Sequence, residues 1–122
     1  MAVKTLFFIG TFGSLGAICR YGVSFILPAS QFPLTTLIIN LIGAFGLGLA
    51  LSFFQSPSPF VIGITVGFFG SFTTFSTFSI DTLRLLQNGL NGPAIFYIGA
   101  SVIGGLLLGL LGLKTGAFLN HL

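Results

Sequence analysis

The sequence contains very little charge. Only 4% of its 122 residues are Asp, Glu, Lys or Arg, whereas soluble domains carry about 25%. So few charges cannot cover a water-exposed surface, and 54% of the residues are hydrophobic. The composition therefore places the chain among membrane proteins. Its length predicts one small domain, residues 1–122.

Residue types needed for catalysis and for metal clusters are also scarce. The chain has one acid, Asp81, one histidine, His121, and one cysteine, Cys19. Because these residues are scattered, the pattern excludes a local catalytic triad, a disulfide framework within one chain and a cysteine–histidine metal cluster. The sequence also has no phosphate-binding motif. We therefore expect a protein that is not an enzyme.

The basic residues do not form a cluster. Lys4, Arg20, Arg84 and Lys114 are spread along the chain, which is not the pattern of a nucleic-acid-binding surface. Arg20 precedes Pro28 by about two helical turns. We therefore expect Arg20 to anchor the first helix at the membrane interface, with anion binding as the alternative role.

Four segments are long and apolar enough to cross a bilayer: residues 3–27, 34–54, 60–87 and 94–118. Short stretches with proline and small polar residues or glycine separate them. The first segment resembles a signal peptide, but Arg20 and Tyr21 stand where a small-residue cleavage site would be expected. The pattern thus predicts an all-α membrane protein of four transmembrane helices.

Glycine is abundant, and several glycines recur at helical spacing. Such pairs let helix backbones approach closely in lipid, where the hydrophobic effect does not drive helices together. They predict tight packing and an oligomer. The pairs are Gly63 with Gly67, Gly105 with Gly109, and Gly112 with Gly116.

The distribution of basic residues barely favours one orientation. None of the three short loops contains Lys or Arg. With both ends in the cytoplasm, Lys4 and Lys114 lie inside and Arg84 outside, a difference of 2 − 1 = 1. We therefore expect insertion in both orientations and an antiparallel dimer about an axis in the membrane plane.

The middle of the third segment, residues 67–79, reads GFFGSFTTFSTFS. Its glycines and β-branched residues weaken a helix, and backbone groups released by a break must face protein, water or an ion. The sequence thus predicts a third helix broken near its middle. The alternative is an intact helix whose hydroxyls bond back to the preceding turn. The hydroxyl residues are Thr73, Thr74, Ser76, Thr77 and Ser79.

This stretch closely resembles the signature of the CrcB or Fluc family of fluoride channels. Two further motifs agree with the resemblance: GxxGAxxRY at residues 13–21 and TLxxNxxGA at residues 36–44. The resemblance covers essentially the whole chain. It implies a passive, fluoride-selective channel that exports fluoride from the cytoplasm across the plasma membrane of a prokaryote.

By this resemblance, Phe75 and Phe78 line the fluoride pathway and Asn40 is the pore asparagine. Fluoride is strongly hydrated, so hydrogen-bond donors and positive ring edges must replace its water. Without the motif, Phe75 and Phe78 would be interpreted as packing residues, whereas for Asn40 both a pore role and a hydrogen bond between helices would be open. The other expected pathway residues are Thr74, Ser76, Thr77, Tyr97 and Ser101.

The resemblance also implies a structural sodium ion on the dimer axis, held by the backbone carbonyls of Gly70 and Thr73. In the fourth segment, Gly105 and Gly109 interrupt a polar stripe that relatives usually continue with hydroxyl residues. One explanation is pairing with a homologous chain rather than with a second copy.

A small multidrug-type, proton-coupled transporter is the alternative function. Such proteins also have four helices and dual topology. That class needs a glutamate in its first helix, and this sequence has none. Asp81, the sole acid, is expected to be a solvated or paired residue near the end of the third segment.

Overall fold

The computed structural model describes residues 2–122, and over that range the chain is helical without a strand. Four stretches are long and apolar enough to cross a membrane: Ala2–Ile26, Leu34–Phe53, Pro59–Gln87 and Asn91–Asn120. The first two are helices α1 (Ala2–Ile26) and α2 (Leu34–Phe53), and the last is α6 (Asn91–Asn120). The predicted all-α membrane fold is confirmed.

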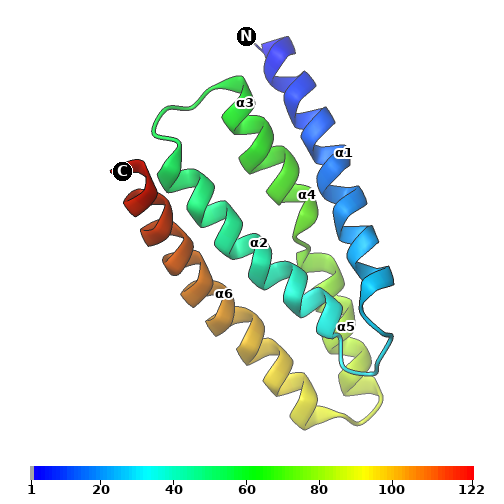
Figure 1. Ribbon diagram of the computed structural model, residues 1–122. Coiled ribbons are helices and arrows are strands. Elements are labelled where there is room, and N and C mark those ends of the chain that lie inside the picture. The colour runs from blue at the N-terminus through cyan, green and yellow to red at the C-terminus, as the bar shows by residue number, and fades with distance from the viewer. Residues whose placement is uncertain (1) are drawn as a thin grey trace.

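The third span is not one continuous helix. It consists of α3 (Pro59–Ile62), the π-helical segment η1 (Gly63–Phe69), the short α4 (Gly70–Phe72) and α5 (Phe75–Gln87). Figure 1 shows the chain leaving helical geometry between α4 and α5, near the middle of the bundle. The expected break is therefore present. The wider π-helical turn before it was not predicted.

The predicted start of the last span was three residues too late. We expected residues 88–93 to form a loop, but α6 begins at Asn91 and includes Gly92 and Pro93. Proline is tolerated in the first turn of a helix because the N–H it lacks has no helical partner there. Pro93 therefore does not delay the helix.

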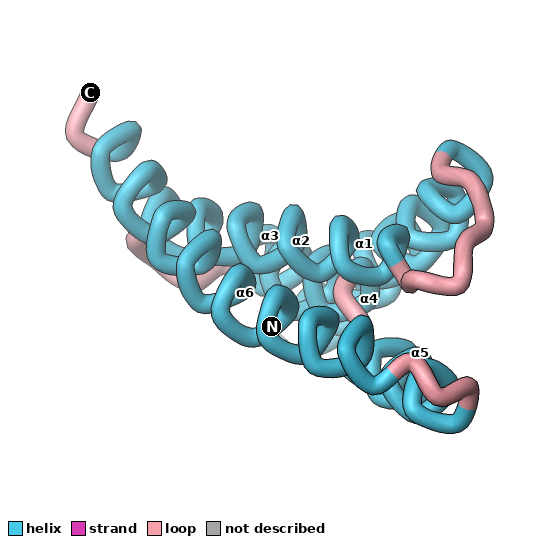
Figure 2. The backbone as a smooth tube through the Cα atoms, turned by 90° about the horizontal axis from the view of Figure 1, so that it is seen from below, coloured by secondary structure: helices cyan, strands magenta, loops and turns pink. Residues whose placement is uncertain are grey.

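The helices pack as two pairs lying side by side. Helix α2 lies along α6, and α1 lies along α3, η1 and α4 (Figure 1). Seen from below, the helices follow a shallow arc, and the α4–α5 loop lies among them (Figure 2). Both termini and the loop between α2 and α3 lie at one end. The α1–α2 and α5–α6 connections lie at the other.

Glycines make the close approach within each pair possible. A Cβ at Gly112 would lie 2.1 Å from the carbonyl oxygen of Phe45, and one at Gly67 would lie 2.8 Å from that of Ile9. The predicted packing role is confirmed at these positions. By contrast, a Cβ at Gly105 would have no atom within 4 Å, so the Gly105–Gly109 pair is not needed for packing inside this chain.

Only a small core is buried inside the chain. It contains Leu37, Leu85, Ala94 and Tyr97 at the end of the bundle where α5 meets α6. Most other large apolar side chains are exposed, including those of Phe7 and Leu106. In a membrane protein, such side chains face lipid or a partner subunit rather than water.

Candidate functional site: a cleft at the broken third span

The break occupies Thr73 and Thr74, both of which have extended backbone geometry, with ψ of 158° and φ of −149°, respectively. In a continuous helix, the Thr74 and Thr77 N–H groups would bond to the carbonyls of Gly70 and Thr73. Here Thr74 N–H donates to Asn40 Oδ1 at 2.8 Å, and Thr77 N–H donates to Thr74 Oγ1 at 3.2 Å. The Gly70 and Thr73 carbonyls therefore lose their usual helical donors.

Asn40 holds the break from the neighbouring helix α2. Besides accepting from Thr74 N–H, its Nδ2 donates to the Thr74 carbonyl at 3.0 Å. The two bonds pair the Asn40 amide with the backbone N–H and C=O of a single residue, Thr74, in the extended segment. Because an amide NH₂ has two hydrogens, Asn40 keeps one further donor. Asn40 can thus both fix the break and offer an N–H to a ligand.

Arg20 also bonds to the broken span. Its Nε donates to the Ser71 carbonyl at 3.0 Å, and Phe75 N–H, the usual helical donor to that carbonyl, lies beyond the break. The Ser71 hydroxyl in turn donates to the Gly13 carbonyl of α1 at 2.6 Å. Arg20, which we expected to anchor α1 at the interface, thus also reaches across to α4.

The predicted hydroxyl residues gather at the start of α5. Thr74 is its N-cap, and the Thr74 hydroxyl donates to Thr77 Oγ1 at 3.1 Å and lies 3.4 Å from Ser76 Oγ. The first turn of a helix presents N–H groups and a partial positive charge. This end of α5 is therefore suited to a negative ion.

Three aromatic side chains and one acidic side chain also lie close together on α5 and α6. The Phe75 and Phe78 rings lie 5.8 Å apart, and the Phe78 and Tyr97 rings 5.2 Å apart. Tyr97 is fully buried, and its hydroxyl donates to Asp81 Oδ2 at 3.3 Å. Asp81 is thus paired with Tyr97, in agreement with one of the two roles expected for it.

A cleft of about 370 Å³ connects several of these groups. It brings together Asn40, Thr74, Phe75, Phe78 and Ser101, whereas Ser76, Thr77 and Tyr97 do not line it. The Ser101 hydroxyl is buried and has no hydrogen-bond partner among residues 2–122. An unpaired buried hydroxyl is costly unless a ligand or water uses it. The cleft therefore offers free donors beside aromatic rings.

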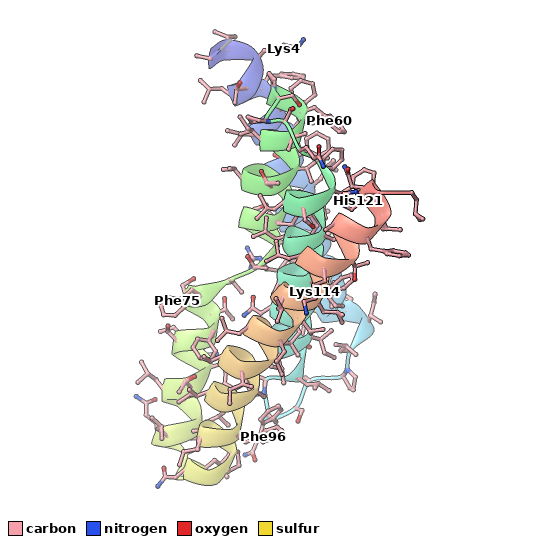
Figure 3. The ribbon with its side chains drawn as sticks, turned by 90° about the vertical axis from the view of Figure 1, so that its left-hand side faces the viewer. Lys4, Phe60, Phe75, Phe96, Lys114 and His121 are labelled. Carbon is pink, nitrogen blue, oxygen red and sulfur yellow. The ribbon has the colours of Figure 1, made fainter. Side chains whose placement is uncertain are left out.

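Phe75 differs from the other cleft residues in its exposure. Its side chain is 80% exposed, and it lies at the outer edge of the bundle beside the break (Figure 3). Gly70 is also exposed, and a Cβ there would meet no atom within 4 Å. A large aromatic ring and the broken helix end are therefore both left uncovered by this chain.

Two contributions to this site were not predicted from the sequence: the hydrogen bond of Arg20 to the broken span and the role of Ser71. An arginine within a membrane span is by itself a signal of a functional or structural partner, so Arg20 could have been paired with the break. Nothing in the local sequence indicates that Ser71 bonds to Gly13, 58 residues away.

Together these features define a small multi-pass membrane protein with a largely apolar cleft at a broken helix, lined also by a few polar groups. The chain belongs to the CrcB-like protein, Camphor Resistance (CrcB) family, whose model matches residues 7–113.

Curated relatives of this chain are named fluoride-specific ion channels. The chain is 43% identical over 118 residues to "Fluoride-specific ion channel FluC 2" of Listeria monocytogenes serotype 4b, covering 93% of this chain and 88% of the relative. It is 46% identical over 105 residues to the protein of that name from Listeria innocua, covering 83% and 81%. It is 41% identical over 118 residues to "Fluoride-specific ion channel FluC 1" of Bacillus cereus strain ATCC 14579, covering 91% and 82%.

Proposed function

We propose that this protein is a passive, fluoride-selective channel that lets fluoride leave the cytoplasm down its gradient. The supporting observation is the cleft at the break, where Asn40, Thr74 and Ser101 bring polar groups together beside Phe75 and Phe78. The curated relatives, at 41% to 46% identity, are named fluoride-specific ion channels. Both the site chemistry and the family point to the same ion.

Selectivity follows from the cost of dehydrating a small anion. Fluoride gives up its water only where several donors replace it at short range. The free N–H of Asn40, the Ser101 hydroxyl and the N-terminal turn of α5 supply such donors. The edges of aromatic rings carry partial positive charge, so Phe75 and Phe78 extend the favourable surface. Chloride is larger and fits this narrow set of donors less well.

The functional unit in this proposal is an antiparallel dimer. Phe75 and Gly70, on either side of the break, are both exposed, and an inverted second copy that covered them would complete the pathway. A homologous chain in inverted orientation is the other possible partner. Because the basic residues barely favour one orientation, both arrangements of the chain can be inserted.

A sodium ion at the dimer axis fits the broken span. The Gly70 and Thr73 carbonyls have lost their usual helical donors to Asn40 and Thr74, and Gly70 lies in open space. Two such carbonyls from each chain would place four oxygens around a hard cation, the ligand type it prefers. The sodium would compensate backbone groups that lipid cannot.

Flux from liposomes tests the function. Vesicles containing only this chain are loaded with fluoride, and efflux is started with a potassium ionophore and followed with a fluoride electrode. We expect rapid release of fluoride and far slower release of chloride. Equal release of the two anions would contradict selectivity, and proton-coupled drug exchange without fluoride flux would favour the transporter function.

The inverted arrangement has its own test. With Cys19 replaced by serine, a single cysteine is placed near either terminus and exposed to an impermeant thiol reagent on one side of intact vesicles. We expect about half of the chains to react from each side, because the two orientations are nearly equivalent. Reaction from one side only in cells expressing this chain alone would exclude the inverted homodimer.

A further inference from the structure

A second, polar pocket lies at the end of the bundle formed by the α1–α2 loop and the last turns of α5. Its volume is about 300 Å³, and it is the most polar of the pockets described for residues 2–122. Asp81, Arg84 and Asn88 line it from α5, and Thr36 from the start of α2. None of the sequence motifs assigned a role to Arg84.

This pocket is joined to the cleft by a chain of contacts. Asp81 accepts the Tyr97 hydroxyl at 3.3 Å, the Tyr97 ring contacts the Phe78 ring, and Phe78 lines the cleft. The polar pocket thus opens toward water at the bundle end and touches, through Asp81 and Tyr97, the aromatic end of the cleft. On the proposed function, it is one mouth of the fluoride pathway.

The mouth contains a group that opposes an anion. Asp81 is the only acidic residue in the whole sequence, and it lies where the pocket meets Tyr97. A carboxylate repels a nearby anion, and the repulsion grows as water is excluded. An uncompensated Asp81 would therefore slow the entry of fluoride by this route.

Arg84 is placed to cancel that repulsion. It follows Asp81 by three residues on α5, a spacing that puts two side chains on the same helix face, and both line the pocket. The other basic residues of the described chain, Lys4, Arg20 and Lys114, do not line it. Arg84 is thus the positive side chain that this pocket offers to an approaching anion.

We infer that Arg84 offsets the charge of Asp81 and draws fluoride into this mouth, so that it sets the rate of entry. The inference rests on the proposed function. Replacing Arg84 should therefore slow fluoride flux at low ionic strength. The effect should disappear when salt screens the charge, as expected for electrostatic steering.

A purely structural role predicts a different result. Arg84 lies in the last turn of α5, where a positive side chain also stabilises the helix dipole. Loss of that contribution would lower the stability of the protein, and because salt also screens the interaction of a charge with the helix dipole, this loss too would be larger at low salt. Thermal unfolding of each variant, measured beside its flux, therefore separates a loss of steering from a loss of flux that follows lost stability.

The experiment compares wild type with Arg84→Lys, Arg84→Gln and Arg84→Glu in liposomes, at fluoride concentrations well below saturation. Ionic strength is set with sodium gluconate on both sides, at about 10 mM, where the screening length is about 30 Å, and at about 1 M, where it is about 3 Å. The lysine variant is the matched control, because it keeps the charge.

At low ionic strength, we expect Arg84→Gln to slow fluoride flux about threefold, Arg84→Glu to slow it more, and Arg84→Lys to leave it nearly unchanged. At high ionic strength, the four proteins should converge. Equal flux of Arg84→Gln and wild type at low salt, an equal loss at both salts, or a loss in Arg84→Lys as large as in Arg84→Gln would overturn the inference. Absence of fluoride flux in wild type would instead overturn the proposed function itself.

Discussion

The side-chain amide of Asn40 is paired with the backbone of Thr74 through two hydrogen bonds. Thr74 N–H donates to Asn40 Oδ1 at 2.8 Å, and Asn40 Nδ2 donates to the Thr74 carbonyl at 3.0 Å. This pairing joins α2 to the broken span. The residue expected to contact fluoride is therefore also the residue that holds the break in place.

Replacing Asn40 by aspartate should damage both roles. The carboxylate can still accept from Thr74 N–H, but it would set an oxygen against the Thr74 carbonyl, where a donor now lies 3.0 Å away. We expect a loss of about 1–3 kcal/mol in stability and near-complete loss of fluoride flux. Thermal unfolding in detergent and liposome flux would measure the two effects.

Asn120→Asp is the matched control for that variant. Asn120 Nδ2 also donates to a backbone carbonyl, that of Phe53, but it does so at the exposed end of α6. We expect normal fluoride flux from Asn120→Asp. If the two aspartate variants lose flux equally, or if Asn40→Asp conducts like wild type, the role assigned to Asn40 is wrong.

The close approach of α2 to the break gives a second prediction, at Gly43. A Cβ added there would lie 2.1 Å from Thr73 Cγ2, so Gly43→Ala must displace Thr73 or the helix. We expect it to cost about 1–3 kcal/mol in stability and to reduce fluoride flux strongly. Gly99→Ala is the control, since a Cβ at Gly99 has no atom within 4 Å.

For this pair, thermal unfolding and fluoride efflux would be measured on the same preparations. The Gly99 variant should be at least as stable as wild type, because alanine favours a helix over glycine by about 1 kcal/mol. Similar behaviour of the two alanine variants would show that the α2–break contact does not matter to the channel.

The two phenylalanines give a third prediction. Phe75→Ile and Phe78→Ile keep much of the side-chain volume but remove the ring edge, so both should greatly reduce fluoride flux. Their effects on stability should differ. Phe75 is 80% exposed, so its replacement should change the stability of the chain by less than about 0.5 kcal/mol. Phe78 packs on the small core, so its replacement should cost about 1 kcal/mol.

Phe118→Ile controls for the loss of any aromatic ring, because Phe118 is 65% exposed near the far end of α6. Its flux should match wild type. Phe75 and Phe78 would be packing residues, and not part of the pathway, if the loss of flux followed the loss of stability or dimerisation across the three variants.

The sequence predicted the break but not the partners that hold it. The run of hydroxyls that follows Gly67 and Gly70 is a local property, and local helix weakness can be read from residue types. The partners of the break lie far away: Arg20 bonds to a residue 51 positions away, and Asn40 to one 34 positions away. Such pairs depend on the rotation and register of whole helices, which spacing along one helix does not fix.

The π-helical segment η1 escaped prediction for a related reason. Its sequence, GITVGFF, has no feature that distinguishes it from an ordinary helix. Within it, Gly63 and Gly67 lie so close to α1 that an added Cβ would come within 2.9 Å of Phe8 or Ile9 atoms. The widened turn lies where the segment packs against α1. We therefore attribute it to tertiary packing, which cannot be predicted from a single sequence.

The glycines of α6 show that helical spacing alone does not predict which glycines pack against a neighbouring helix. Spacing alone predicted two packing pairs, Gly105 with Gly109 and Gly112 with Gly116, yet of these four positions an added Cβ would clash with α2 only at Gly112 and Gly116. The open space at Gly105 means that its small size is not required by packing within this chain. The stripe of hydroxyl residues on α6 thus ends at Ser101, although packing within this chain does not require a glycine at Gly105. Pairing with a complementary partner chain is one explanation.

Ser101 gives the last prediction, because stability and flux should change in opposite senses. Its hydroxyl is buried in the cleft without a hydrogen-bond partner in the described chain, residues 2–122. Removing a buried hydroxyl that has no protein partner is neutral or stabilising. We therefore expect Ser101→Ala to unfold at the same temperature as wild type or slightly higher, and to conduct fluoride several-fold more slowly.

Ser52→Ala should instead lower the stability of the protein and leave fluoride flux unchanged. The Ser52 hydroxyl donates to the Gly48 carbonyl at 3.0 Å and lies outside the cleft, so its loss should cost about 0.5–1.5 kcal/mol and leave flux intact. Measuring unfolding and efflux for both serine variants separates a ligand-binding hydroxyl from a structural one. Unchanged flux in a well-folded Ser101→Ala dimer would mean that fluoride does not use this hydroxyl, and that the pathway leaves α6 before Ser101.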